Sequence, residues 1–166
     1  MTIKAGEYSY TNYIDNIPVG NTTLTVKDGI FASFNGVHYL NCTYIKEDVN
    51  INGLTGSHGF YSQHLSDGYV FLSDEVTDFK IKVIPFPLEV GERLYGPFSS
   101  ITTENFYLTV VKHHAQYTNK NGLTFNNVFQ ATDKTSKINI YLNEDNYIIQ
   151  KEDLRYIPTV QSLTNN

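Results

Sequence analysis

The sequence predicts an all-β fold, an antiparallel barrel, half-barrel or sandwich of about 10 or 11 short strands with little helix. Two observations support this prediction. Asn-Gly or Asp-Gly dipeptides, which favour tight hairpin turns, recur along the chain, and apolar residues alternate with polar ones between them. The dipeptides are Asp28-Gly29, Asn35-Gly36, Asn52-Gly53, Asp67-Gly68 and Asn121-Gly122.

The clearest predicted unit is a hairpin in which residues 30–34 and 37–45 flank Asn35-Gly36. No window of the chain shows a convincing helical period, so helix is expected only as short turns near 89–95 and 151–156. Further strands are predicted at 7–14, 21–27, 58–64, 69–73, 77–84, 101–112, 123–132, 137–143 and 146–151.

The chain is expected to form one domain, residues 1–166, because its length suits a single hydrophobic core. Pro85 and Pro87 interrupt the strand pattern, since proline cannot donate a hydrogen bond to a sheet. The segment 85–92 is therefore interpreted as a crossover between two parts of the β structure. A linker between two independent domains is the alternative.

Composition excludes several functional classes. The net charge is −5 and the 12 Lys and Arg residues are scattered, so no nucleic-acid partner is expected. No apolar run is long enough for a transmembrane segment. Cys42 is the single cysteine, which excludes an intramolecular disulfide or a cysteine zinc cage, and no cofactor is expected.

No catalytic or metal-binding constellation is recognisable, so the protein is expected not to be an enzyme. The histidines lack ligand spacing, and the carboxylates near a predicted hairpin are interpreted as acidic caps on loops. The string Gly56-Ser57-His58-Gly59 lacks the spacing of a nucleophile elbow. The histidines are His38, His58, His64, His113 and His114, and the carboxylates are Asp67, Asp74, Glu75 and Asp78.

Aromatic residues are the most informative remaining feature, with 13 Tyr and 10 Phe in 166 residues. They are explained either by a tyrosine-rich core with cross-strand ring pairs or by a concave, ring-lined surface. Such a surface would bind a hydrophobic or carbohydrate ligand, with tyrosine hydroxyls fixing its orientation. The candidate ligand-binding residues are Tyr39, Tyr44, Phe60, Tyr61, Tyr69 and Phe71.

Two motifs in the second half carry a resemblance to a known class of proteins. The first is the run from Pro87 to Glu92, the second is the run from Gly122 to Val128, and the strand pair 140–151 follows them. Residues 87–151 resemble exported bacterial lipoproteins and periplasmic proteins with a lipocalin-like or open-barrel β domain. The chain departs from that pattern in two places. It has Leu94-Tyr95 where the pattern has Trp, and its final turn, residues 143–146, lacks the glycines of the pattern.

The resemblance implies an exported protein of the periplasm or cell surface, with a cytoplasmic location as the alternative. We therefore expect a non-enzymatic cell-envelope protein that binds a hydrophobic or carbohydrate ligand or assists envelope assembly. A second hypothesis is a protein-interaction module, such as an inhibitor, immunity or appendage-assembly protein, acting through an exposed sheet edge or aromatic patch.

Overall fold

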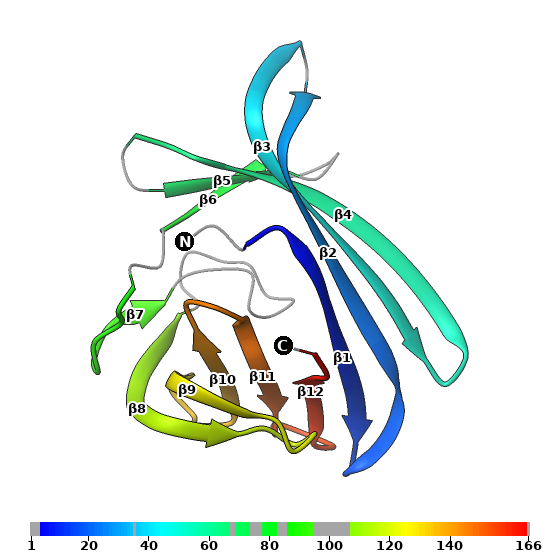
Figure 1. The fold of residues 1–166 in the computed structure, drawn as a ribbon, viewed down its shortest axis with the longest axis vertical. Helices are drawn as coiled ribbons and strands as arrows, with labels where there is room; N and C mark the ends of the chain where they lie inside the picture. Colours follow the sequence, from blue (N-terminus) through cyan, green and yellow to red (C-terminus); the bar gives the residue numbers. More distant parts are fainter. Residues whose placement is uncertain are drawn as a thin grey trace.

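A computed structural model describes residues 4–34, 36–66, 69–73, 78–82, 86–94 and 107–165, leaving aside the side chains of 34, 69–73 and 78–82. The described strands form one antiparallel sheet of 12 strands in the order β6-β5-β4-β3-β2-β1-β12-β11-β10-β9-β8-β7 (Figure 1). Every neighbour in this order is also a neighbour along the chain except β1 and β12. The first and last strands therefore pair in the middle of the sheet.

The strands differ widely in length, from two residues to 18. The longest, β2 and β3, run past the curled strands of the C-terminal half (Figure 1). Their bounds are β1 Gly6–Ile14, β2 Ile17–Phe34, β3 Val37–Ile51, β4 Leu54–His64, β5 Tyr69–Ser73, β6 Asp78–Lys82, β7 Arg93–Leu94, β8 Leu108–Thr118, β9 Thr124–Thr132, β10 Ile138–Asn143, β11 Tyr147–Asp153 and β12 Thr159–Leu163.

The predicted all-β, antiparallel character is confirmed, and the described residues contain no helix. The sheet is not closed into a barrel, because β6 and β7 stand at opposite ends of the strand order. The segment 86–92, where the crossover is predicted, precedes β7. Asp67, Gly68, Asp74, Glu75 and residues 83–85 and 95–106 lie outside the described residues.

The prediction of short strands is wrong for β2 and β3, which have 18 and 15 residues. Asp28-Gly29 does not end a strand. It forms a bulge inside β2, where Gly29 has φ 69° and the pairing shifts between Lys27 and Ile30. A bulge inserts an extra residue while the strand continues, so a dipeptide with turn chemistry can be accommodated inside a long strand.

The predicted helical turn at 151–156 is also wrong. Lys151 and Asp153 continue β11, because this segment pairs with β10 on one side and β12 on the other. Strand β12 was not predicted, since its sequence from Thr159 to Leu163 lacks clear apolar alternation. Near 89–94 the chain forms turns and the two-residue strand β7.

The hairpin predicted at Asn35-Gly36 is confirmed by the pairing of Phe34 with Val37. Asn35 itself lies outside the described residues. The turn at Asn52-Gly53 is confirmed as well, since both residues have positive φ, of 52° and 81°, and join β3 to β4. Positive φ at both central residues is typical of the tight turns that match strand twist.

In the described residues the hydrophobic core forms two clusters, which lie mainly in the C-terminal half and include Tyr10 of β1. The first packs strands β8 to β10 against the segment that contains Leu88 and Leu94. The second joins the tip of the β8–β9 hairpin to β1, β11 and β12. The first cluster contains Leu88, Leu94, Leu108, Val110, Phe129, Ala131, Ile138, Ile140 and Leu142, and the second contains Tyr10, Phe125, Val128, Ile149 and Leu163.

Polar contacts hold the loop of residues 119–123, between β8 and β9, against the neighbouring strands. Asn119 donates from Nδ2 to the carbonyl oxygen of Leu163 at 2.8 Å, and Asn121 donates to the carbonyl oxygen of Ser162 at 2.8 Å. The backbone N–H of Lys120 donates to Oε1 of Gln150 at 2.8 Å. These bonds hold the tip of the β8–β9 hairpin against β11 and β12.

The β9–β10 turn is organised by Asp133, and this gives a pH prediction. Desolvation raises the pKa of Asp133, but hydrogen bonds from the backbone of Ile138, Thr135 and Lys137 and from the Thr135 hydroxyl outweigh it, so the pKa is lowered. The ionised carboxylate therefore stabilises the fold above the unfolded-state pKa, about 3.9, and this contribution is lost as pH falls through the folded-state value.

We expect acidification from pH 5 to pH 2 to destabilise the wild type more than the Asp133→Asn variant, which has no carboxylate to protonate at this position. Urea unfolding followed by tyrosine fluorescence at several pH values measures the difference. Equal losses in the two proteins would show that Asp133 does not contribute to acid sensitivity.

Candidate functional site

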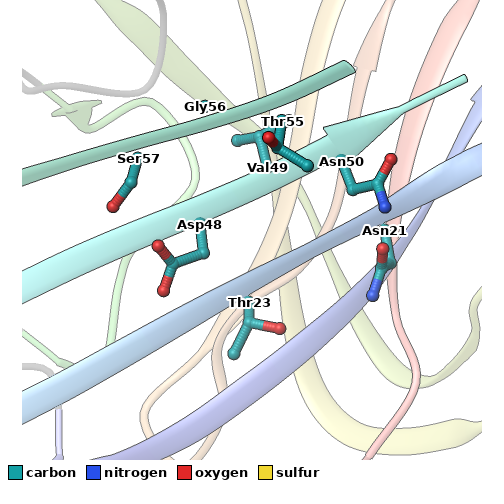
Figure 2. A pocket seen from close by; sticks show the side chains of 8 residues that line it. All are labelled: Asn21, Thr23, Asp48, Val49, Asn50, Thr55, Gly56 and Ser57. Atoms are coloured by element: carbon teal, nitrogen blue, oxygen red, sulfur yellow. The ribbon is translucent and has the colours of Figure 1, made fainter. Parts of the chain in front are cut away.

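The described residues contain an open, polar depression on one face of the long strands β2, β3 and β4 (Figure 2). Its volume is about 480 Å³. Residues two apart on a strand share a face, and directly paired residues of neighbouring strands do so too. Asn21, Asn50 and Thr55 form one cross-strand row, and Thr23, Asp48 and Ser57 form the next. We call the face that carries these six residues the polar face.

Several side chains of the polar face have unused hydrogen-bonding capacity. Asn21, Thr23 and Thr55 make no side-chain hydrogen bond with any residue in the described part of the chain. Asn50 accepts one bond, from the backbone N–H of Gly53 at 3.2 Å. The two hydroxyls and two amides offer donors and acceptors to a ligand without breaking a structural contact.

One carboxylate lies among these neutral groups. Hydrogen bonds from Ser57 and Lys46 lower the pKa of Asp48, and the Lys46 Nζ lies 2.9 Å from Asp48 Oδ2. The same contact raises the pKa of Lys46. Asp48 is therefore ionised at neutral pH and partly neutralised by Lys46, so the depression accepts hydrogen bonds without carrying a strong net charge.

A pair of tyrosines lies further along the same face. Tyr44 and Tyr61 are direct partners on β3 and β4, with ring centroids 4.8 Å apart. The Tyr44 ring extends over Gly59, since a Cβ on that residue would collide with the ring and hydroxyl. Gly59 thus leaves the space in which the Tyr44 ring lies, and the ring remains partly exposed.

The structure brings together only some of the predicted ligand-binding residues. Tyr44 and Tyr61 form the ring pair, whereas Phe60 is adjacent to Tyr61 on β4 and pairs with the buried Ile45 on the other face. Tyr39 is half-buried near the β2–β3 hairpin and pairs with Ala32. Tyr69 and Phe71 occupy β5, whose side chains are not described. The members of the set whose side chains are described therefore do not form one cluster.

The polar residues of the depression were not predicted as a site. Their signal is present in the sequence, because Asn21, Thr23 and Thr25 alternate with Thr22, Leu24 and Val26. Thr22 and Val26 are buried, while Asn21 is exposed. Alternation of this kind shows which side chains face solvent, but pairing with β3 and β4 is needed to show that polar residues from three strands converge.

The histidines and carboxylates are dispersed in the described part of the chain, where no three His, Cys, Asp or Glu residues are grouped as a metal site. His113 stacks on Phe129 at 4.6 Å, and His114 lies 3.2 Å from the amide oxygen of Gln130. No helix in the described residues has the length and apolar character needed to cross a bilayer.

Comparison with protein-family models, with curated proteins and with solved structures finds no match to this chain.

Proposed function

We propose that this chain is a non-enzymatic, carbohydrate-binding protein of the cell envelope, and that it binds its ligand on the polar face. The observation that carries this proposal is the convergence of Asn21, Thr23 and Thr55, with unused hydrogen-bonding groups, in one open depression. Sugar hydroxyls both donate and accept hydrogen bonds, which suits a surface of amides, hydroxyls and one carboxylate.

The character of the depression favours a glycan over the hydrophobic ligand that the sequence also allows. Apolar ligands are usually held in concave sites lined mainly by hydrophobic side chains. Here Asn21, Asp48 and Ser57 point from the strands into an open depression (Figure 2). An oligosaccharide can bind such a surface while part of it stays in water.

The envelope location rests on the resemblance of residues 87–151 to exported lipoproteins and periplasmic proteins. Immunodetection of the native protein in envelope fractions is the expected result, and detection in the cytosol alone would contradict this location.

Among the predicted arrangements we favour the half-barrel, because the loop 119–123 contacts Gln150 and Leu163 on β11 and β12.

Asn21→Ala is expected to weaken glycan binding about fivefold, because one neutral hydrogen bond contributes roughly 0.5–1.5 kcal/mol. Isothermal titration calorimetry would compare hexasaccharides of 1,4-linked glucose, xylose and N-acetylglucosamine, after a thermal-shift screen that also includes fatty acids and phospholipids. Ligand binding at 100 times Kd should stabilise the wild type by about 2.7 kcal/mol.

Gln116→Ala is a matched control, since Gln116 is an exposed strand residue on β8, outside the polar face. It should bind as the wild type does. No binding of any oligosaccharide, or equal affinity in the wild type and Asn21→Ala, would contradict the proposed site.

A different observation favours a protein-interaction module as second candidate. Near the β2–β3 turn, Phe31, Val37 and Leu40 are 58%, 53% and 65% exposed, and this end of the hairpin projects from the molecule (Figure 1). Exposed apolar residues at the end of a projecting hairpin are available to a protein partner. This function requires that Phe31→Ser abolish capture of a protein partner while Asn21→Ala leaves it intact.

A further inference from the structure

We propose that Tyr44 forms a second sugar-binding position on the polar face, and that the ligand is an extended oligosaccharide lying along β3 from Asn50 to Tyr44. This inference rests on the carbohydrate-binding function proposed above. It adds the direction in which the ligand lies, its minimum length and an aromatic contact outside the depression.

The alternation of β3 places both positions on one face. Asn50, Asp48, Lys46 and Tyr44 are each two residues apart, so their side chains project to the same side of the strand. Their pairing agrees, because Asn50 and Asp48 pair with Thr55 and Ser57 on β4, which also line the depression. A ligand in the depression can therefore reach Tyr44 without leaving this face.

The Tyr44 ring is placed to contact a sugar. It lies over Gly59, because the absence of a side chain there allows the ring to approach the sheet. The hydroxyl reaches β4 at this glycine. Within the described part of the chain, Tyr44 makes a ring contact with Tyr61 but no hydrogen bond. A half-exposed ring with an unpaired hydroxyl offers both an apolar surface for sugar C–H groups and a polar group for a sugar hydroxyl.

The distance between the two positions sets the length of the ligand. Tyr44 is six residues from Asn50, which corresponds to about 20 Å along a strand. The Lys46–Asp48 ion pair, 2.9 Å long, lies between them and adds charged partners for sugar hydroxyls. A ligand that contacts both ends must therefore contain several sugar units, whereas a shorter one can fill only the depression.

The test measures how binding affinity depends on oligosaccharide length, and whether Tyr44→Leu removes this dependence. We expect the hexasaccharide that binds the wild type to bind about tenfold tighter than the trisaccharide of the same sugar. Tyr44→Leu should remove this tenfold gain, as expected when an aromatic contact that dominates an interface is truncated, and should change trisaccharide affinity less than twofold. Tyr44→Phe, which retains the ring, should keep most of the gain.

Tyr156→Leu is the matched control, because Tyr156 is 89% exposed and lies outside the polar face, so hexasaccharide affinity should not change. If Tyr44→Leu fails to fold, an NMR titration of the wild type still tests the contact. The Tyr44 ring signals in ¹H–¹³C NMR spectra should shift on titration with the hexasaccharide and not with the trisaccharide.

The outcomes separate this inference from the proposed function. Binding that depends on Asn21, with equal affinity for both lengths and no effect of Tyr44→Leu, would overturn the second position and leave the depression as the site. Equal weakening of both lengths by Tyr44→Leu would also overturn it, as would the absence of any Tyr44 ring shift. Failure of the wild type to bind any oligosaccharide would remove both proposals.

Discussion

Gly20→Ala is expected to lower the free energy of unfolding by about 3 kcal/mol, a large effect for a substitution that adds one methyl group. Gly20 lies in β2 with φ +154°, and a Cβ at this position would collide with the backbone carbonyl oxygen of Asn50 on β3. A backbone atom cannot rotate away as a flexible side chain can, so the two strands would have to separate.

The location of Gly20 explains why such separation is costly. It pairs with Ile51 on β3 and with Asn12 on β1, next to a register shift between Asn12 and Tyr13. The neighbouring residue Val19 accepts a hydrogen bond from the backbone N–H of Asn52 at 2.7 Å. Movement of β2 would therefore disturb pairing on both sides.

Gly56→Ala is the matched control, because Gly56 lies in the same sheet without a positive φ and has no atom near its Cβ position. Urea unfolding at constant pH should show a change below about 1 kcal/mol for this variant. A Gly20→Ala protein as stable as the wild type would contradict the close approach of Gly20 to the Asn50 carbonyl oxygen.

Asn-Gly identifies turns well, whereas Asp28-Gly29 forms a bulge inside β2 and a turn without glycine was not predicted. Asn52-Gly53 joins β3 to β4 as predicted, because both residues accept positive φ. Asp15-Asn16 makes an equivalent turn between β1 and β2, with φ 49° and 63°, although neither residue is glycine. Turn chemistry therefore indicates where a hairpin can form, and strand pairing decides where one does.

Strand length and the order of strands in the sheet could not be read from local patterns. The pairing of β1 with β12 joins residues more than 140 positions apart, for example Tyr10 and Leu163. The pairing of β12 with β11 on its other side allows a buried polar residue, Ser162, to lie in a strand, since its hydroxyl donates to Oε1 of Gln150 at 3.2 Å. Alternation of apolar residues cannot identify a strand in which polar side chains are buried and satisfied.

The candidate site was only partly predictable for a related reason. The excess of aromatic residues led to Tyr44 and Tyr61, which do lie together, but it also led to Phe60, which occupies the opposite face. The polar residues of the depression come from three strands. Their convergence depends on the register of β2, β3 and β4, which belongs to the paired strands and cannot be read from the alternation of any one of them.

Asn119→Ala is expected to lower the free energy of unfolding by about 2–4 kcal/mol, since it removes three hydrogen bonds of a buried side chain and leaves the backbone N–H groups of Asn121 and Leu123 without this acceptor. Asn119 is 4% exposed, and its Nδ2 donates to the carbonyl oxygen of Leu163 at 2.8 Å. Its Oδ1 accepts from the backbone N–H groups of Asn121 at 3.1 Å and Leu123 at 3.0 Å. One side chain thus organises the loop 119–123 and attaches it to β12.

Loss of this attachment should allow the loop 119–123 to open locally while the rest of the protein stays folded. Hydrogen exchange is expected to quicken at the amides of Asn121 and Leu123, whose acceptor is removed, while the amide of Ile140 in β10 keeps most of its protection. Asn126→Ala is a suitable control, because Asn126 is an exposed residue of the same hairpin, and it should change stability by less than about 0.5 kcal/mol. An Asn119→Ala protein with unchanged stability and unchanged exchange would show that the loop is held by its other contacts, chiefly the Asn121 bonds to Ser162 and Leu163.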